Sequence, residues 1–259
     1  RTYSLDALPQ EYPSLGTGDF RNFVLNIENA DGSQCCDPVY VSHKITKGKY
    51  NLSGLPAVRA GENEAETLEI LLADPNTNME IHLLYGVLEK EDIITRSVII
   101  KNAGETSVTI RKAQSACLDF LHGDYDLIKF YGRHAMERNM ERVPVSHGSI
   151  RLGSRRGTSS HQYNPGVILA QKNANEDSGS CYGMLLVYSG NFLCEAEKDQ
   201  YNQTRLQMGL TDELFAYPPR FYVKNPTFDN FRRLFEVSSD TAISAGRYLF
   251  NTAIPSVRR

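Results

Sequence analysis

The sequence predicts an all-β protein, a sandwich of two large antiparallel sheets followed by a short C-terminal tail with a helical pattern. Short alternating or β-branched apolar runs recur along most of the chain, and turn-forming residues separate them. Before residue 218, no long segment shows the 3.6-residue apolar period of an amphipathic helix. With 259 residues, of which 41% are hydrophobic, the chain is also long enough to bury one large core.

The first half of the chain predicts a meander of antiparallel hairpins. Turn-forming residues separate the predicted strands, because Gly, Asn, Asp and Pro favour reversal of the chain. The clearest turn is Asp74–Asn78, which reads Asp-Pro-Asn-Thr-Asn. Five strands are expected here: Val39–Ile45, Thr67–Leu72, Met79–Leu88, Ile93–Lys101 and Ser107–Phe120.

The second half continues in the same style. The tripeptide Ser189-Gly190-Asn191 favours a tight hairpin between two neighbouring strands, and Asn173–Gly179 has the composition of a polar surface loop. Many short strands at close spacing are typical of two sheets packed face to face. Six strands are expected here: Asp126–Gly132, Gly148–Leu152, Val167–Gln171, Tyr182–Ser189, Phe192–Lys198 and Gln203–Leu210.

The pattern changes after Pro218-Pro219. Apolar residues recur at helical spacing between Thr227 and Val237, and Asp240 is placed to cap a second helical stretch that ends near residues 248–250. We therefore divide the chain into a sandwich of residues 1–217 and an atypical segment of residues 218–259. This segment is expected to pack on the sandwich, because it would cover an otherwise open sheet edge. The helically spaced residues are Phe228, Phe231, Leu234 and Phe235.

Charge and composition exclude several classes of partner. The net charge is −3, from 28 basic and 31 acidic residues, whereas a nucleic-acid-binding protein needs a basic stripe that neutralises phosphates. No apolar run approaches the length of a membrane span, and no secretory signal opens the chain. Cys117, Cys181 and Cys194 lie in apolar runs, where a free thiol behaves as a small buried hydrophobe. We therefore expect a cytoplasmic protein without a nucleic-acid or membrane partner.

Four separated motifs carry a resemblance to a known family. They are Leu5–Pro13 (LDALPQEYP), Gly16–Arg21 (GTGDFR), Ser154–Pro165 (SRRGTSSHQYNP) and Leu186–Phe192 (LVYSGNF). In this order they resemble the N-terminal domain of the α-galactosidases of glycoside hydrolase family 36, and the match runs from about Arg1 to Tyr217. The resemblance implies a β-supersandwich for the matched segment.

The resemblance also implies that catalysis lies elsewhere. Members of this family hydrolyse terminal α-galactosides with retention, using two aspartates on a (β/α)8 barrel and no cofactor. Such a barrel needs about 250 residues of its own, for which this chain has no room beside the sandwich. We therefore assign no catalytic residue and expect no turnover by the chain alone. The six histidines show no metal-ligand spacing, so no metal site is expected either.

Asp19 is the first candidate for contact with substrate. It lies between two glycines and Arg21 in the Gly16–Arg21 turn, which can present a carboxylate without steric cover. By resemblance, loops of this domain approach the sugar pocket of a neighbouring subunit in a homo-oligomer. The alternative is that Asp19 pairs with Arg21 or Arg156 inside the domain.

His161, Gln162 and Asn164 form the second candidate group. Imidazole and amide groups suit the hydroxyl groups of a neutral sugar because they donate and accept hydrogen bonds at once. The alternative is a structural polar corner, since Asn164-Pro165 is a common turn opener. Tyr163 either stacks on a sugar face or is buried.

The arginines of the middle region are expected to be structural. Arg151, Arg155 and Arg156 form its dense basic cluster. Because guanidinium groups are well suited to bidentate pairing, we expect all three to anchor internal ion pairs or hydrogen bonds.

Three functions remain open at this stage. The first is a scaffold, oligomer-contact and substrate-wall domain of an α-galactosidase that acts on oligosaccharides such as raffinose or melibiose. The second is a free-standing, lectin-like carbohydrate-binding module, against which the absence of Trp counts. The third is a separate enzyme, which would need a pair of acids in a cleft.

Overall fold

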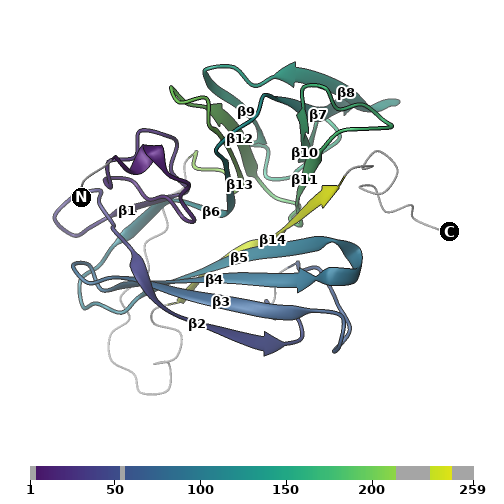
Figure 1. Ribbon diagram of the computed structural model, residues 1–259. Helices are drawn as coiled ribbons and strands as arrows, with labels where there is room; N and C mark the ends of the chain where they lie inside the picture. The colour runs from purple at the N-terminus through teal and green to yellow at the C-terminus, as the bar shows by residue number, and fades with distance from the viewer. Residues whose placement is uncertain (1–3, 53–55, 214–233, 247–259) are drawn as a thin grey trace.

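Strands dominate the computed structural model, which describes residues 4–52, 56–213 and, for the backbone alone, 234–246 (Figure 1). Apart from β9, the strands pair in antiparallel fashion and form two extended sheets, as the sequence predicts. In chain order the elements are η1 (Leu5–Ala7), β1 (Leu25–Glu28), β2 (Val39–Lys47), β3 (Glu66–Asp74), β4 (Met79–Leu88), η2 (Glu89–Glu91), β5 (Ile93–Asn102), β6 (Thr109–Phe120), β7 (Tyr125–Arg133), β8 (Met136–Pro144), β9 (Gly148–Ser154), β10 (Tyr163–Gln171), β11 (Cys181–Leu186), β12 (Phe192–Lys198), β13 (Thr204–Leu210) and β14 (Leu234–Gly246).

The larger sheet has nine strands in the order β2-β3-β4-β5-β14-β11-β10-β7-β8, and the smaller has the order β1-β6-β13-β12. Figure 1 shows β14, in yellow, between the group β2–β5 and the group that contains β7, β10 and β11. Within the described residues, no helix is long and apolar enough to span a membrane.

Two groups of buried side chains fill the space between the sheets. In the first, Met79, Ile81 and Leu83 of β4 pack with residues of β1 and β6. In the second, residues of β7, β10 and β11 pack with Phe192 of β12 and Leu206 of β13. In strands such as β1 and much of β4, alternate residues enter the core, which is the two-residue period that the sequence shows. The side chains of Cys117, Cys181 and Cys194 are buried, as expected, and none of them forms a disulfide.

Besides β14, two strands escape prediction from the sequence. β1 reads Leu-Asn-Ile-Glu and its burial alternates, but a run of only four residues does not stand out as a strand in the sequence. β8 reads Met-Glu-Arg-Asn-Met-Glu-Arg-Val-Pro, and nearly all of its residues are exposed. Because β8 is an edge strand with little burial on either face, it needs no apolar alternation.

The helical prediction for the C-terminal tail is wrong where the structure describes it. Residues 234–246 form β14, which pairs with β5 through Val237 and Val98 and with β11 through Ile243 and Met184. A helix there would leave the backbone N–H and C=O groups on one edge of β5 and of β11 without partners. The need to pair these backbone groups outweighs the helical spacing of Leu234 and Phe235 in the sequence. The remaining residues of the two predicted helices, 227–233 and 247–250, lie outside the described residues.

Candidate functional site

Asp19 lies in a buried ion-pair network. Its Oδ1 accepts hydrogen bonds from the backbone N and from Nε of Arg21, each at 2.9 Å. Its Oδ2 accepts from Nη2 of Arg21 and Nη2 of Arg205, again at 2.9 Å. The Asp19 side chain is 2% exposed, so both of its oxygens are engaged and covered.

Arg205 connects Asp19 to a second aspartate. It donates from Nε and Nη2 to the two carboxylate oxygens of Asp119, both at 2.7 Å, and its side chain is 1% exposed. Nη1 of Arg21 lies 3.4 Å from Oδ2 of Asp119. Two aspartates and two arginines give a formally neutral group, called here the Asp–Arg cluster (Asp19, Arg21, Asp119 and Arg205). Neutrality and complete hydrogen bonding are the conditions under which buried charges are tolerated.

The Asp–Arg cluster holds the N-terminal segment against the smaller sheet. Asp119 of β6 and Arg205 of β13 are cross-strand neighbours in that sheet. From the N-terminal segment, the backbone N of Gln10 donates to Asp119 at 2.9 Å, and the carbonyl oxygen of Asn22 accepts from Arg205 at 2.8 Å. The first two sequence motifs therefore meet at the smaller sheet.

The Gly16–Arg21 turn thus presents a different side chain from the one expected. Asp19 pairs with Arg21, the alternative considered from the sequence, and with Arg205, while Arg156 contacts Gln162 instead. This pairing contradicts the expectation that the turn presents the Asp19 carboxylate without steric cover. Contact between Asp19 and a sugar stays a prediction. Phe20 is the residue that the turn exposes, with 85% of its surface accessible.

Acid is expected to weaken the Asp–Arg cluster. Burial raises the pKa of Asp19, but the hydrogen bonds from Arg21 and the charge of Arg205 together outweigh burial and hold this pKa below its usual value. A lowered folded pKa stabilises the fold above the unfolded pKa of about 3.9, and this stabilisation is lost as the pH falls through the folded pKa. Urea unfolding between about pH 7 and about pH 3 measures the loss. The Asp19→Asn variant should show a shallower pH dependence, and an unchanged slope would contradict this assignment.

The third motif forms a loop on the surface. Arg155 is exposed and pairs with Glu213 at 2.6 Å, and the exposed Arg156 donates to Oε1 of Gln162. The half-exposed Arg151 pairs with Asp212 at 3.1 Å. The expectation of internal anchors is therefore wrong for Arg155 and Arg156, because flanking segments leave their guanidinium groups open to solvent.

The third motif (Ser154–Pro165) and the fourth motif (Leu186–Phe192) are joined by hydrogen bonds. The backbone N of Ser159 donates to the carbonyl oxygen of Ser189 at 2.7 Å, and the N of Gly157 donates to Oδ1 of Asn191 at 2.6 Å. Gly157 has φ 83°, a backbone conformation that favours glycine. The hairpin turn of residues 189–191 therefore fixes the start of the loop that carries the second candidate group.

The second candidate group lies at the end of this loop, where β10 begins. His161 and Gln162 are exposed, and Asn164 is partly buried. His161 has no hydrogen-bond partner among the described residues, and neither does Nδ2 of Asn164, which is fully covered. No hydrogen bond or ion pair between described residues joins these three side chains to Asp19. The structure therefore separates the two predicted groups.

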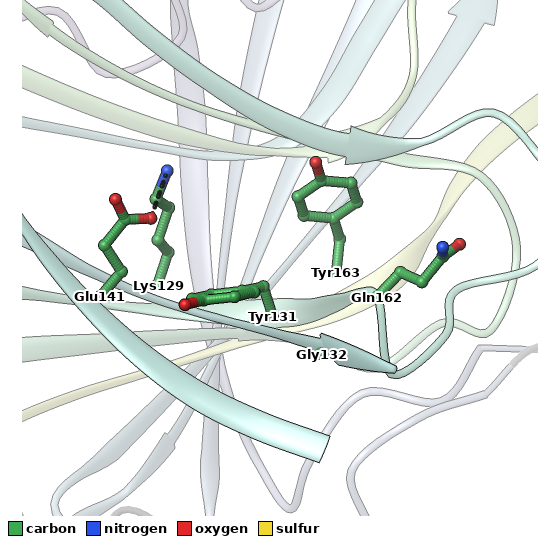
Figure 2. A pocket seen from close by; sticks show the side chains of 6 residues that line it. All are labelled: Lys129, Tyr131, Gly132, Glu141, Gln162 and Tyr163. Carbon is green, nitrogen blue, oxygen red and sulfur yellow. Dashed lines mark ion pairs between the residues drawn. The ribbon is translucent and has the colours of Figure 1, made fainter. Parts of the chain in front are cut away.

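Gln162 lines a hollow of about 260 Å³ on the same part of the surface. Figure 2 shows the side chains around it, which come from β7, β8, β10 and the loop that precedes β10. The sequence indicates Tyr163 as one possible stacking residue, but it carries no signal for the lining residues of β7 and β8. The lining residues are Lys129, Tyr131, Gly132, Glu141, Gln162 and Tyr163. Among the described residues, no group of three or more His, Cys, Asp or Glu is placed to hold a metal ion.

Comparison with known proteins gives a consistent result. Residues 1–218 match the family described as the glycosyl hydrolase family 36 N-terminal domain. The bifunctional α-galactosidase/sucrose kinase AgaSK of Mediterraneibacter gnavus is 67% identical over 218 residues, which cover 84% of this chain and 23% of that protein. The α-galactosidase AgaA of Geobacillus stearothermophilus is 45% identical over 218 residues, or 84% of this chain and 30% of that protein.

Solved structures agree with this match. The crystal structure of an AgaA variant in complex with stachyose has a TM-score of 0.88 and 39% identity, and the superposition covers 95% of this chain and 33% of that one. The chain therefore spans about a quarter to a third of the length of these relatives. A free-standing lectin-like module is not favoured, because the relatives that match are α-galactosidases. On these grounds the chain belongs to glycoside hydrolase family 36, and it corresponds to the N-terminal domain of that family's α-galactosidases.

Proposed function

We propose that this chain serves as the N-terminal scaffold of an α-galactosidase, which hydrolyses terminal α-galactosyl residues of oligosaccharides such as raffinose or melibiose. The single observation that supports this proposal most strongly is the 67% identity to an α-galactosidase/sucrose kinase over the matched 218 residues. Crystal structures of AgaA variants in complex with raffinose and with stachyose support the proposed class of substrate.

The acids of the described residues support a scaffold rather than a catalyst. Retaining hydrolysis needs two carboxyl groups about 5–5.5 Å apart on either side of the glycosidic bond. Three buried acids in and beside the smaller sheet are already engaged: Asp19 and Asp119 by arginines, and Glu195 by Gln207 at 3.0 Å and Lys112 at 3.6 Å. Burial raises the pKa of Glu197, but this carboxylate accepts the backbone N–H of Asn22 at 2.7 Å. We place the catalytic aspartates in a separate barrel that needs no cofactor.

Exposed apolar side chains support a role in contacts with other parts of the enzyme. Phe20 is 85% exposed although both of its sequence neighbours belong to the buried Asp–Arg cluster, so a rigid turn holds it out from the surface. Edge strand β2 exposes Tyr40 and Ile45, at 60% and 66%. We propose that these surfaces meet the barrel or a second subunit of a homo-oligomer. Asp19, His161, Gln162 and Asn164 stay predicted substrate contacts at such a junction.

Two further parts of the proposal concern the chain itself. The division at residue 217 stays a prediction, although β14 lies within the larger sheet. The compartment that we propose is the cytoplasm, and five cysteines that form no disulfide agree with a reducing environment.

A chimera tests the proposed function. Residues 1–217 replace the matching segment of the Geobacillus stearothermophilus α-galactosidase, and hydrolysis of a chromogenic α-galactoside is measured. We expect the chimera to be active, whereas the 259-residue chain alone and the relative without its N-terminal segment should both be inactive. Turnover by the chain alone, abolished by one acid substitution, would contradict the proposal. A folded but inactive chimera beside an active parent enzyme would contradict it as well.

A further inference from the structure

We propose that the hollow between β7, β8 and β10 binds one ring of a neutral oligosaccharide. It is called here the tyrosine hollow, and its residues are Lys129, Tyr131, Gly132, Glu141, Gln162 and Tyr163. The inference rests on the proposed function only for the choice of sugar, because the binding chemistry comes from this chain alone.

The fold creates the hollow at the end of the sandwich core. Leu127 packs in the second core group, and the two-residue period of β7 places Lys129 and Tyr131 on the same face of the sheet. Glu141 of β8 lies opposite Lys129, and Tyr163 of β10 lies opposite Tyr131. This face of the sheet therefore changes from buried apolar residues to exposed aromatic and polar ones as it leaves the cover of the core.

Two tyrosines give the hollow its apolar surface. Tyr131 and Tyr163 are 43% and 48% exposed, and neither hydroxyl has a hydrogen-bond partner among the described residues. In Figure 2 the Tyr131 ring lies flat along its strand, while the Tyr163 ring stands up beside it. The C–H groups on one face of a pyranose ring can stack on such an aromatic surface, and the free hydroxyl groups can bond those of the sugar.

The polar groups of the hollow favour an uncharged ligand. Nζ of Lys129 lies 3.0 Å from Oε2 of Glu141, so these two charges compensate each other. Gln162 lies at the other end, where its Oε1 accepts from Arg156 and its side chain points away from the two tyrosines in Figure 2, so it adds no charge to the hollow. A volume of about 260 Å³ is slightly below the ~300–1,000 Å³ of typical ligand pockets, which suits one sugar ring rather than a whole oligosaccharide.

The walls of the hollow are held in place before a ligand binds. The backbone N of Gln162 donates to Oγ of Ser160 at 3.2 Å. A Cβ at Gly132 would lie 2.3 Å from the carbonyl oxygen of Met136, so the hairpin of β7 and β8 closes tightly only with glycine there. Pre-formed walls lower the entropic cost of binding.

A titration of the full 259-residue chain with raffinose tests the inference. The tyrosine rings are labelled with ¹³C, and their NMR signals are followed during the titration. We expect the signals of Tyr131 and Tyr163, assigned through the Tyr131→Phe and Tyr163→Phe variants, to shift and saturate in the millimolar range that a small contact predicts. Tyr131→Ala or Tyr163→Ala should weaken binding by about two- to twelvefold, the value of one aromatic contact.

Matched variants make the result decisive. Tyr201→Ala removes a tyrosine that is 54% exposed on another loop, and it should leave raffinose binding unchanged. The two Phe variants keep the rings and should bind more tightly than the Ala variants. The inference is overturned if neither signal shifts, if the double variant Tyr131→Ala/Tyr163→Ala binds normally, or if Tyr201→Ala weakens binding as much. The chimera is tested for turnover, whereas the chain is tested for binding. Failure of the proposed function is therefore distinguishable from failure of the proposed sugar site.

Discussion

Replacing Arg205 by alanine is expected to lower the free energy of unfolding by about 3–5 kcal/mol, the effect of breaking a buried ion pair. The Arg205→Ala variant removes two hydrogen bonds of 2.7 Å from Asp119 and one of 2.9 Å from Asp19. The side chains of both aspartates are 2% exposed, so water cannot replace the lost guanidinium. Denaturant unfolding of wild type and variant measures the difference.

Two further variants test whether the loss of stability comes from leaving a buried charge without its partner. The double variant Arg205→Met/Asp119→Leu removes both charges and leaves Asp19 paired with Arg21, so it should recover much of the lost stability. Arg155→Ala breaks an ion pair at a side chain that is 75% exposed, and its effect should stay within about 0.5 kcal/mol. The interpretation of the Asp–Arg cluster fails if Arg205→Ala costs no more than Arg155→Ala.

Most of the strands that the sequence predicts correctly contribute side chains to the core. β4 and β10 show apolar residues at the positions that the structure buries, and local residues decide their pattern. β14 is different, because its conformation depends on β5 and β11, which are distant in sequence. Since a helical spacing of apolar residues says nothing about an unpaired edge elsewhere, the sequence alone could not identify this strand.

The Asp–Arg cluster shows a similar limit for the candidate site. The sequence indicates that Asp19 either faces a sugar or pairs with an arginine, but Arg205 is 186 residues away from it. β13 alternates polar and apolar residues, a pattern that normally predicts one solvent-exposed face. Here Arg205 and Gln207 of that face are buried, and the N-terminal segment contributes bonds to the same cluster. When a loop covers one face of a sheet, as the N-terminal segment does here, the apolar period of the strand does not reveal that this face is buried.

The tyrosine hollow is also a product of long-range pairing. Tyr131 and Tyr163 become neighbours only because β7 pairs with β10 across the intervening hairpin and loop. A weak signal exists in β7, where Tyr125, Leu127, Lys129 and Tyr131 share one face. The pattern of that face does not indicate at which residue the strand leaves the buried core and becomes exposed.

Replacing Phe192 by alanine is the second change with a large expected effect. Phe192 is 1% exposed, lies in the second core group, and pairs with Leu210 of β13. A buried Phe→Ala substitution costs about 3–5 kcal/mol, because the removed ring leaves a cavity between the two sheets. For a chain of this size we expect the melting temperature to fall by about 6–20 °C.

The same substitution should also loosen the loop that holds Gln162. Phe192 directly follows the hairpin turn of residues 189–191, which bonds the backbone of Gly157 and Ser159. Amide hydrogen exchange at these two residues should therefore become faster in Phe192→Ala, in addition to the loss of melting temperature. Phe20→Ala is the matched control: it removes the same ring from a site that is 85% exposed, so melting temperature and exchange should both stay at their wild-type values. Equal losses in the two variants would contradict the assignment of Phe192 to the core and of Phe20 to an open contact surface.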